Sequence, residues 1–177
     1  MNLKKLASLT VGLILLTQPS WAFEKKDLMK LKKTKKCVSS TFSDCDLSGV
    51  SLSGFNLSEA NLEGANLEGA KLEDMDLSKA NLNEANLKGA KLIKVNLNQA
   101  QLKEANLEGA ILISVSCEEC SLKDAKLKNV LLKGVSLKNA NLKDAVLENT
   151  ALKLANLSGV IGIKDSACKP GSFGVCK

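Results

Sequence analysis

Apolar and polar residues recur with a period of five along residues 42–160. A leucine occupies every fifth position from Leu47 to Leu157, and only Cys117 interrupts the series. Two positions before each leucine stands a small or apolar residue, most often an alanine such as Ala60. Because a helix brings apolar residues round every 3.6 positions and a strand every two, neither element alone explains this spacing.

A chain that repeats one short extended side and one turn every five residues closes a square after four such units. Squares of this kind can stack at the strand spacing of about 4.8 Å, which gives a solenoid. The central leucine and the residue two before it then point inward, and the other three positions face water. The sequence therefore predicts an all-β, four-sided solenoid of about six coils.

The residue two positions after each leucine marks the corner. The third residue of a type II turn needs a positive φ, which glycine and asparagine tolerate. Glycine or asparagine stands there at Gly49, Gly54, Gly64, Gly69, Gly89, Gly109, Gly134, Gly159, Asn129, Asn139 and Asn149. We expect a different turn type at the corners that carry Glu59, Lys79, Glu84, Lys94 and Glu104.

Three segments state the repeat in full: residues 60–64 (ANLEG), 65–69 (ANLEG) and 105–109 (ANLEG). They resemble the A(D/N)LxG unit of the pentapeptide repeat proteins, and the resemblance covers roughly two thirds of the chain. It implies a right-handed quadrilateral β-helix and no shared activity. The segment 31–49 is also similar to the entry segment of exported, disulfide-containing members, although its cysteines are more widely spaced.

The chain begins with the features of an export signal. Lys4 and Lys5 precede an apolar run over residues 6–16, and Ala22 ends a short stretch suited to cleavage. We predict a signal peptide over 1–22; the alternative, an uncleaved membrane anchor, needs a longer apolar run. No stable membrane anchor is expected after cleavage, and the predicted location is the periplasm or, in a photosynthetic source, a thylakoid lumen.

Both ends of the solenoid, which spans 42–160, need covers because each coil buries its core only against its neighbours. Residues 23–41 are predicted to form a short N-terminal cap helix and entry segment, with Leu28 and Leu31 over the first coil. Residues 161–177, where the five-residue register ends, are predicted to form a disulfide-stapled C-terminal loop cap.

All six cysteines follow the predicted leader, which favours disulfides. A solenoid keeps distant residues apart, so local pairs are expected. These pairs are Cys37 with Cys45, Cys117 with Cys120, and Cys168 with Cys176. The C-x-x-C spacing of Cys117 and Cys120 also suggests a thiol–disulfide redox pair, although the usual βαβ context is missing. A zinc site is not expected, since the chain has no histidine.

Charge is distributed in columns of residues twenty apart. The formal charge of +6 falls to +4 without Lys4 and Lys5. The lysine-rich stretch 24–36 is interpreted as part of the solvated cap, with membrane or nucleic-acid binding as the alternative. One column alternates Glu68, Lys88, Glu108, Lys128 and Glu148, and a second contains Lys103, Lys123 and Lys143. The first should be attractive along the stack. Neither carries the aromatic residues that would stack bases, so no nucleic-acid partner is expected.

Apolar residues at outward positions cluster on one side. Apart from Val146, they belong to the side centred on residues 92, 112, 132 and 152: Ile93, Ile111, Ile113, Leu131, Ala151 and Leu154. A contiguous apolar patch usually marks a contact surface, so we predict an unknown protein partner or self-association there. The alternative is that another part of the chain covers this side.

The composition gives little support to catalysis. The chain has no histidine, tyrosine or arginine, and its carboxylates lie on regular exposed turns. We therefore predict a non-catalytic exported scaffold or protein-binding module without a cofactor, and a redox partner as the alternative. Some members of the resembling family mimic DNA and bind gyrase through an acidic surface, but the mixed columns and the leader disfavour that role here.

Overall fold

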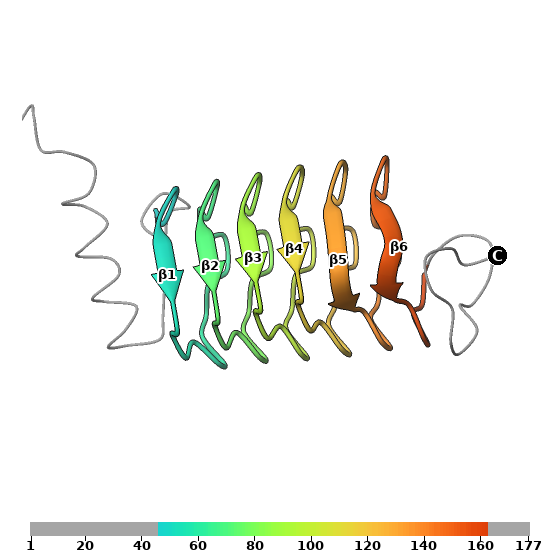
Figure 1. The fold of residues 1–177 in the computed structure, drawn as a ribbon, viewed down its shortest axis with the longest axis horizontal. Helices are drawn as coiled ribbons and strands as arrows, with labels where there is room; N and C mark the ends of the chain where they lie inside the picture. The colour runs from blue at the N-terminus through green and yellow to red at the C-terminus, as the bar shows by residue number, and fades with distance from the viewer. Residues whose placement is uncertain (1–45, 163–177) are drawn as a thin grey trace, which may run out of the picture.

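A computed structural model of the chain describes residues 46–162, except for the side chains of residues 151, 153 and 154. These residues form one parallel sheet of six strands in sequential order, stacked along the axis of a solenoid (Figure 1). The strands are β1 (Ser51–Ser53), β2 (Lys71–Glu73), β3 (Lys91–Ile93), β4 (Ile111–Ile113), β5 (Leu131–Ser136) and β6 (Ala151–Asn156). The predicted four-sided β-solenoid is confirmed.

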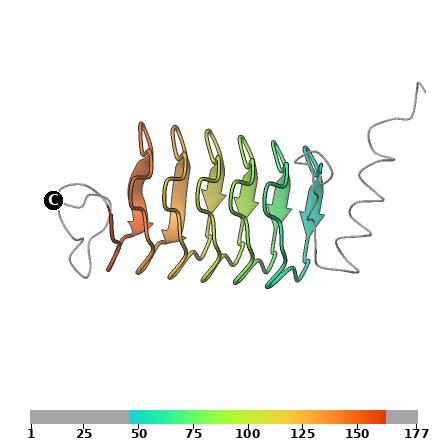
Figure 2. The ribbon, with the colours of Figure 1, turned by 180° about the vertical axis from the view of Figure 1, so that it is seen from behind.

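From β1 to β5 each strand pairs with residues twenty positions along the chain. Leu52 lies opposite Leu72, and Leu72 lies opposite Leu92. On the other three sides single bridges keep the same interval, as between Asn61 and Asn81. Seen from behind, the coils remain evenly stacked (Figure 2). Four five-residue units therefore form the four sides of one twenty-residue coil.

The interior contains leucine and small apolar residues. The central leucines Leu62, Leu82 and Leu102 have exposures of 1%, 1% and 0%, and the alanines beside them are equally buried. Within residues 46–162 no polar or charged residue is buried. Each enclosed leucine side chain stabilises the stack by about 1.5–3 kcal/mol, so a coil with four of them needs no aromatic core.

The corners from Gly49 to Asn149, and the corner at Gly159, use the same left-handed backbone whatever the side chain. Gly109 has φ +67°, and the non-glycine corner residues have φ between 50° and 60°. They include the five for which we expected a different turn: Glu59, Lys79, Glu84, Lys94 and Glu104. That expectation is wrong, because the coil-to-coil hydrogen bonds impose the conformation.

The corner at Glu104 shows how the bonds do this. The Glu104 N–H donates to the carbonyl of Lys123 in the next coil (2.9 Å), and the Ala105 N–H closes the turn to the Leu102 carbonyl (3.1 Å). The glycine corner at Gly64 makes the equivalent bonds at 2.9 and 3.0 Å. The ladder therefore overrides the preference of the side chain for negative φ.

Asparagine and aspartate before the central leucine cap the turns. The Asn61 Oδ1 accepts a hydrogen bond from the Glu63 N–H (3.1 Å), which is an Asx turn. On one side these amides also bond to each other along the axis: Asn86 Nδ2 donates to Asn66 Oδ1 (3.2 Å), and Asn106 Nδ2 donates to Asn86 Oδ1 (3.3 Å). Such ladders occupy the polar groups that the sides expose.

The ends of the described stack are less tightly enclosed. Phe55 in the first coil and Leu147 and Leu152 in the last are only partly buried. The ladder extends slightly beyond the predicted limit of residue 160, because Ile161 bridges to Asn141. The predicted cap helix, the C-terminal loop cap and the leader lie outside the described residues. From 46 to 162 the structure has no helix long and apolar enough to cross a membrane.

The left-handed corners can be tested at Gly109, where an added Cβ would meet no atom within 4 Å. Because space is available, the cost of a substitution there should be conformational only. We expect Gly109→Val to lower the free energy of unfolding by about 1–2 kcal/mol and Gly109→Asn to lower it much less, as measured by chemical denaturation. Equal effects of the two substitutions would contradict the assigned backbone.

Candidate functional site

The outward side of the sheet β1–β6, called here the strand face, combines apolar and basic residues. Strand alternation turns the first and third residues of each three-residue strand outward, while the central leucine points into the core. β4 presents Ile111 and Ile113, β3 presents Lys91 and Ile93, and β5 begins with Leu131. The strand face is therefore apolar at β4 and mixed on both sides of it.

Four of these residues form one contiguous group, the apolar patch: Ile93, Ile111, Ile113 and Leu131. Ile93 pairs in register with Ile113, and Ile111 pairs with Leu131. The three isoleucines are half-buried by their neighbours, and Leu131 is 45% exposed. The sequence prediction named all four, and the stacking brings them together as neighbours on adjacent strands.

The two other residues predicted for this surface cannot be placed in the patch. The side chains of Ala151 and Leu154 lie outside the described part of the structure. The backbone also departs from the regular register there, because Lys133 pairs with Leu154, one residue further along than the interval at Leu131 and Ala151. Val146, 48% exposed, lies on a neighbouring side, as the column pattern predicts.

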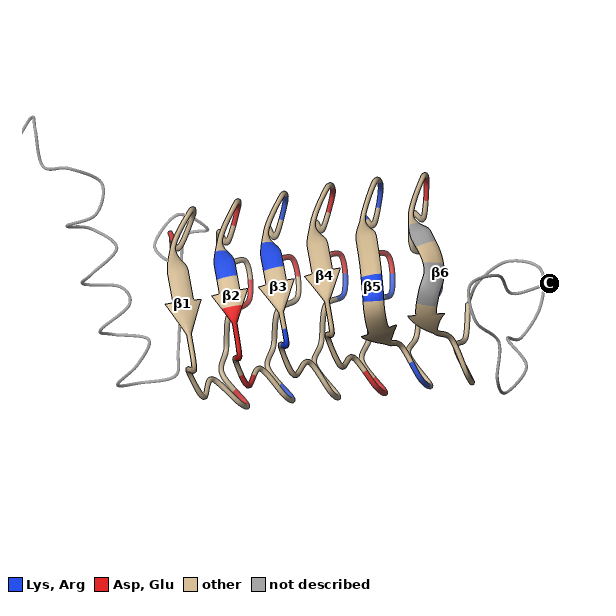
Figure 3. Cartoon of the chain, in the orientation of Figure 1, with Lys and Arg blue, Asp and Glu red and all other residues tan. Residues whose placement is uncertain are grey.

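Lysines border the apolar patch. Lys71 and Lys91 lie before it and Lys133 after it, and all three are exposed; Figure 3 shows lysine positions in blue on β2, β3 and β5. None of them has a carboxylate within 4.0 Å among residues 46–162, whereas Lys94 at the edge of the face contacts Asp74 at 3.7 Å. The strand face thus has cationic groups that the described residues leave without an ion pair.

A disulfide joins Cys117 and Cys120 across one corner on the adjacent side. The two Cα atoms lie 5.3 Å apart, within the usual range for a disulfide. Cys117 takes a central leucine position and Cys120 takes an inward alanine position, so both sulfurs are inside the tube. The Cys120 Sγ also lies 2.9 Å from the Cys117 carbonyl oxygen, but an oxidised sulfur has no proton to donate. The other two predicted pairs lie outside the described residues.

The disulfide is poorly placed for exchange with another thiol. Cys117 is 2% and Cys120 is 1% exposed. Thiol–disulfide exchange requires an attacking thiolate to reach a sulfur atom. The corner would have to open before such an attack.

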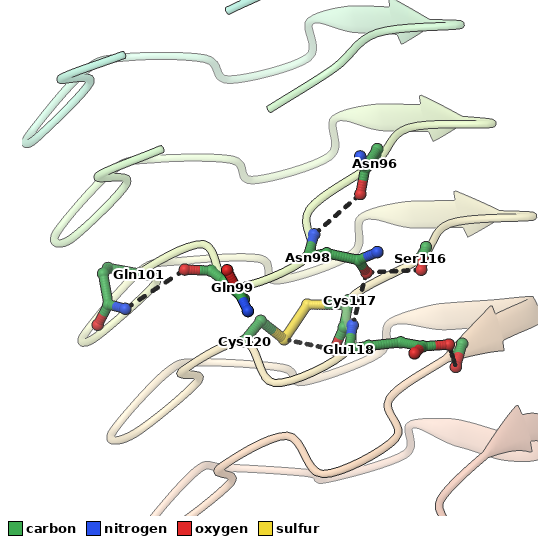
Figure 4. The surroundings of a disulfide bond; sticks show 9 residues. Asn96, Asn98, Gln99, Gln101, Ser116, Cys117, Glu118 and Cys120 are labelled. Carbon is green, nitrogen blue, oxygen red and sulfur yellow. Dashed lines mark hydrogen bonds between the residues drawn. A yellow bond between two sulfur atoms is a disulfide. The ribbon is translucent and has the colours of Figure 1, made fainter. Parts of the chain in front are cut away.

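Asn98 supports the disulfide corner from the preceding coil (Figure 4). Its Oδ1 accepts hydrogen bonds from the Glu118 N–H (2.9 Å) and from the Ser116 hydroxyl (2.6 Å). Where an asparagine or aspartate precedes the central leucine, as at Asn61 and Asn106, that residue caps the equivalent N–H within its own coil. Here that position is Ser116, so an asparagine twenty residues before Glu118 supplies the acceptor.

An asparagine of the preceding coil replaces the Asx cap at a second corner as well. Gln101 stands where Lys103 would need an Asx cap, and the Asn83 Oδ1 accepts from the Lys103 N–H instead (2.9 Å). Neither asparagine role was predicted from the sequence. The sequence does contain a signal for this role. Each asparagine directly follows a central leucine, and the turn twenty residues later lacks the usual asparagine or aspartate before its central position.

The other predicted columns behave as ordinary surface. In the basic column, Lys103 contacts Glu104 at 2.8 Å and Lys123 contacts Asp124 at 3.5 Å. The hydrogen bond to Glu104 and its charge raise the pKa of Lys103. In the alternating column, visible along the upper edge of Figure 3, Lys128 contacts Glu148 at 3.1 Å.

The described residues contain no group of three or more potential metal ligands close enough to hold an ion. Two interior voids, of about 20 and 10 Å³, are lined by leucines with one cysteine and one methionine. They are small and apolar, so they offer no polar group that could orient a substrate. The outer sides are therefore the surfaces on which this part of the chain can act.

The family model for pentapeptide repeats matches residues 40–78, 80–116 and 120–159, in eight copies. A search of curated protein sequences gives no significant match.

Similar solved structures include three pentapeptide repeat proteins. One, from Nostoc PCC 7120, is 29% identical over 51% of this chain and 77% of its own, with a TM-score of 0.46. One from the Arabidopsis thaliana thylakoid lumen is 35% identical over 50% and 68%, with a TM-score of 0.34. One from the cyanobacterium Cyanothece 51142 is 25% identical over 81% and 97%, with a TM-score of 0.35.

Replacing the disulfide by the ordinary repeat residues should be nearly neutral. Cys117→Leu with Cys120→Ala loses a cross-link worth about 2 kcal/mol for so short a loop, and it replaces two buried sulfurs by three buried carbons, which restores about 1 kcal/mol. We expect its free energy of unfolding to lie within about 1 kcal/mol of the wild type. The control, Cys117→Ala with Cys120→Ala, lacks the leucine and should be about 2–5 kcal/mol less stable than the leucine variant. Similar losses of unfolding free energy in both double variants would contradict the interpretation that these two positions serve only to fill the core.

The role of Asn98 can be tested by moving the acceptor. Asn98→Ala leaves the Glu118 N–H without its partner and should lower the free energy of unfolding by about 1 kcal/mol. Ser116→Asn in the same chain supplies an Asx cap from within the coil and should restore most of that loss. Denaturation of the two single variants and the double variant measures the coupling. Additive effects would show that the two caps are independent.

Proposed function

Since the chain belongs to the pentapeptide repeat family, we propose that it is a non-catalytic, exported scaffold whose strand face binds another protein. The observation that carries this proposal is the apolar patch with its border of lysines. Contiguous apolar surface on a soluble protein commonly marks an interaction site, and charged groups at its edge give specificity and steer association.

The rigidity of the strand face also supports a binding role. The outward side chains of β3, β4 and β5 stand on a backbone held by inter-strand hydrogen bonds and a buried leucine column. A surface that is already ordered loses little conformational entropy when a partner binds. A flat, ordered surface of this kind suits another folded surface.

The chemistry of the chain does not favour catalysis. It contains no histidine, tyrosine or arginine. The pKa of Lys103 is raised, but by the hydrogen bond and charge of the exposed Glu104 rather than by a pocket. Active sites usually combine perturbed titratable groups with a concave, partly polar surface, whereas the voids found among residues 46–162 are small and apolar and Lys103 does not line them.

Export is proposed from the sequence of residues 1–22, which has the basic start, apolar run and small-residue end of a signal peptide. The cysteines all follow it, as expected for a chain that enters an oxidising compartment. We propose the periplasm or, in a photosynthetic source, the thylakoid lumen.

The two alternative functions have weaker support. A redox partner would need accessible sulfurs, whereas Cys117 and Cys120 are nearly fully enclosed. A DNA mimic would need columns of stacked carboxylates, whereas the column from Glu68 to Glu148 alternates in sign.

Affinity capture from the native compartment tests the proposal. Ile111→Lys with Ile113→Lys places two charges at the centre of the apolar patch and should reduce recovery of the specific partner at least tenfold (about 1.4 kcal/mol). Gln101→Lys with Ser121→Lys is the matched control, because it adds the same charge on the opposite side of the solenoid. Equal recovery with both baits would overturn the strand face as the binding surface.

A further inference from the structure

Charge is graded along the axis of the solenoid. The first two coils, residues 46–85, contain eight carboxylates and two lysines. Residues 86–125 contain five of each, and residues 126–162 contain two carboxylates and six lysines. One end of the described stack is therefore acidic and the other basic, so two copies attract each other when their axes run in opposite directions.

The strand face is self-complementary in the same orientation. A two-fold axis parallel to the strands, passing between β3 and β4, places β3 of one copy opposite β4 of the other, β2 opposite β5, and β1 opposite β6. This operation keeps the first residue of each strand opposite the first, and the third opposite the third. All six strands then overlap.

We propose that the strand face binds a second copy of this chain in this antiparallel arrangement. This inference rests on the proposed function because it uses the same strand face, and it identifies the binding partner as a second copy of the chain. It makes a closed, isologous dimer, in which every contact occurs twice.

The residues that meet are compatible at each level. Ile93 faces Ile113 of the second copy at the centre of the interface. Lys91 faces Ile111 of the second copy, which the aliphatic part of the lysine can cover while the amine stays in water.

Where β2 of one copy faces β5 of the other, one of the contacts is ionic. Glu73 faces Lys133 of the second copy, and neither residue has an ion pair within the described part of its own chain. Lys71 faces the exposed Leu131 of the second copy. No like charges oppose each other among these positions.

The parallel alternative, with the two-fold axis along the solenoid, is less favourable. It also produces a local match, since Lys71 would face Glu73 of the second copy. However, it places the acidic coils of the two copies together and the basic coils together, so the axial gradient becomes repulsive. The gradient therefore selects the antiparallel arrangement.

The dimensions of the strand face indicate a reversible dimer. Six strands at a spacing of about 4.8 Å extend about 24 Å, and three residues extend about 10 Å. An interface of this size falls in the class of weak complexes. We expect the mass in solution to rise with protein concentration and to fall back at high salt, because exposed ion pairs are screened.

Sedimentation equilibrium of the full chain, over micromolar to millimolar concentrations, tests the proposal. Ile113→Lys should weaken dimerisation at least tenfold, since it places a lysine against Ile93 of the second copy at two symmetric sites. Glu73→Lys and Lys133→Glu should each weaken it several-fold, and the double variant should recover most of the wild-type association. Gln101→Lys, on the opposite side, should leave the mass unchanged, and thermal unfolding confirms that each variant is folded.

A monomer at all concentrations would overturn the proposal, and so would a dimer that is insensitive to Ile113→Lys. Rescue of Glu73→Lys by Lys71→Glu rather than by Lys133→Glu would overturn the antiparallel orientation in favour of the parallel one. If the chain is monomeric but affinity capture still depends on the apolar patch, the proposed function stands and only the second copy is excluded.

Discussion

The structure depends on the hydrogen bonds between backbones twenty residues apart. In each coil the N–H of a central leucine donates to a carbonyl in the following coil, as Leu62 does to Asn81 at 2.7 Å, and the residue before it donates backwards, as Asn81 does to Ala60 at 2.9 Å. Buried backbone groups need such partners. The ladder supplies them on all four sides, which leaves the leucines to stack without interruption by polar groups.

The same ladder determines what the surface can carry. It holds the corners from Gly49 to Asn149 in a left-handed conformation, even where the side chain is glutamate or lysine, and each such residue opposes this conformation by about 1–2 kcal/mol. Among residues 46–162 six glutamates and lysines take this conformation, because the carbonyl of the next coil and the turn-closing bond both require that geometry. Charged residues therefore occupy the corners in columns, and the stacking decides which charges become neighbours.

The coil, the core and the composition of each side could be predicted from the sequence, because one spacing determines all three. Once Leu62, Leu82 and Leu102 are stacked, the position of Ile93 beside Ile113 follows directly. The corners at Glu59 and Glu104 could not be predicted from residue preference, since the deciding hydrogen bonds come from another coil.

For the same reason the supporting role of Asn98 was missed, because its partner Glu118 is twenty residues away. The register shift between β5 and β6 was also not foreseen, since the five-residue pattern of the sequence continues unchanged through Leu152 and Leu157.

The constant interval of twenty residues has a consequence for how such a chain can change in length. Duplication or loss of one whole coil would leave every later residue on the side it occupied before. The residues that become adjacent in the stack would have the same backbone geometry as the original neighbours. Insertion of a single five-residue unit would instead turn everything after it by a quarter of a revolution and carry Ile111 and Ile113 to a different side. Insertions or deletions that preserve the surface should therefore span whole coils, about sixty nucleotides of the gene each. Insertion of a single five-residue unit would keep the leucine core but change which residues share a side.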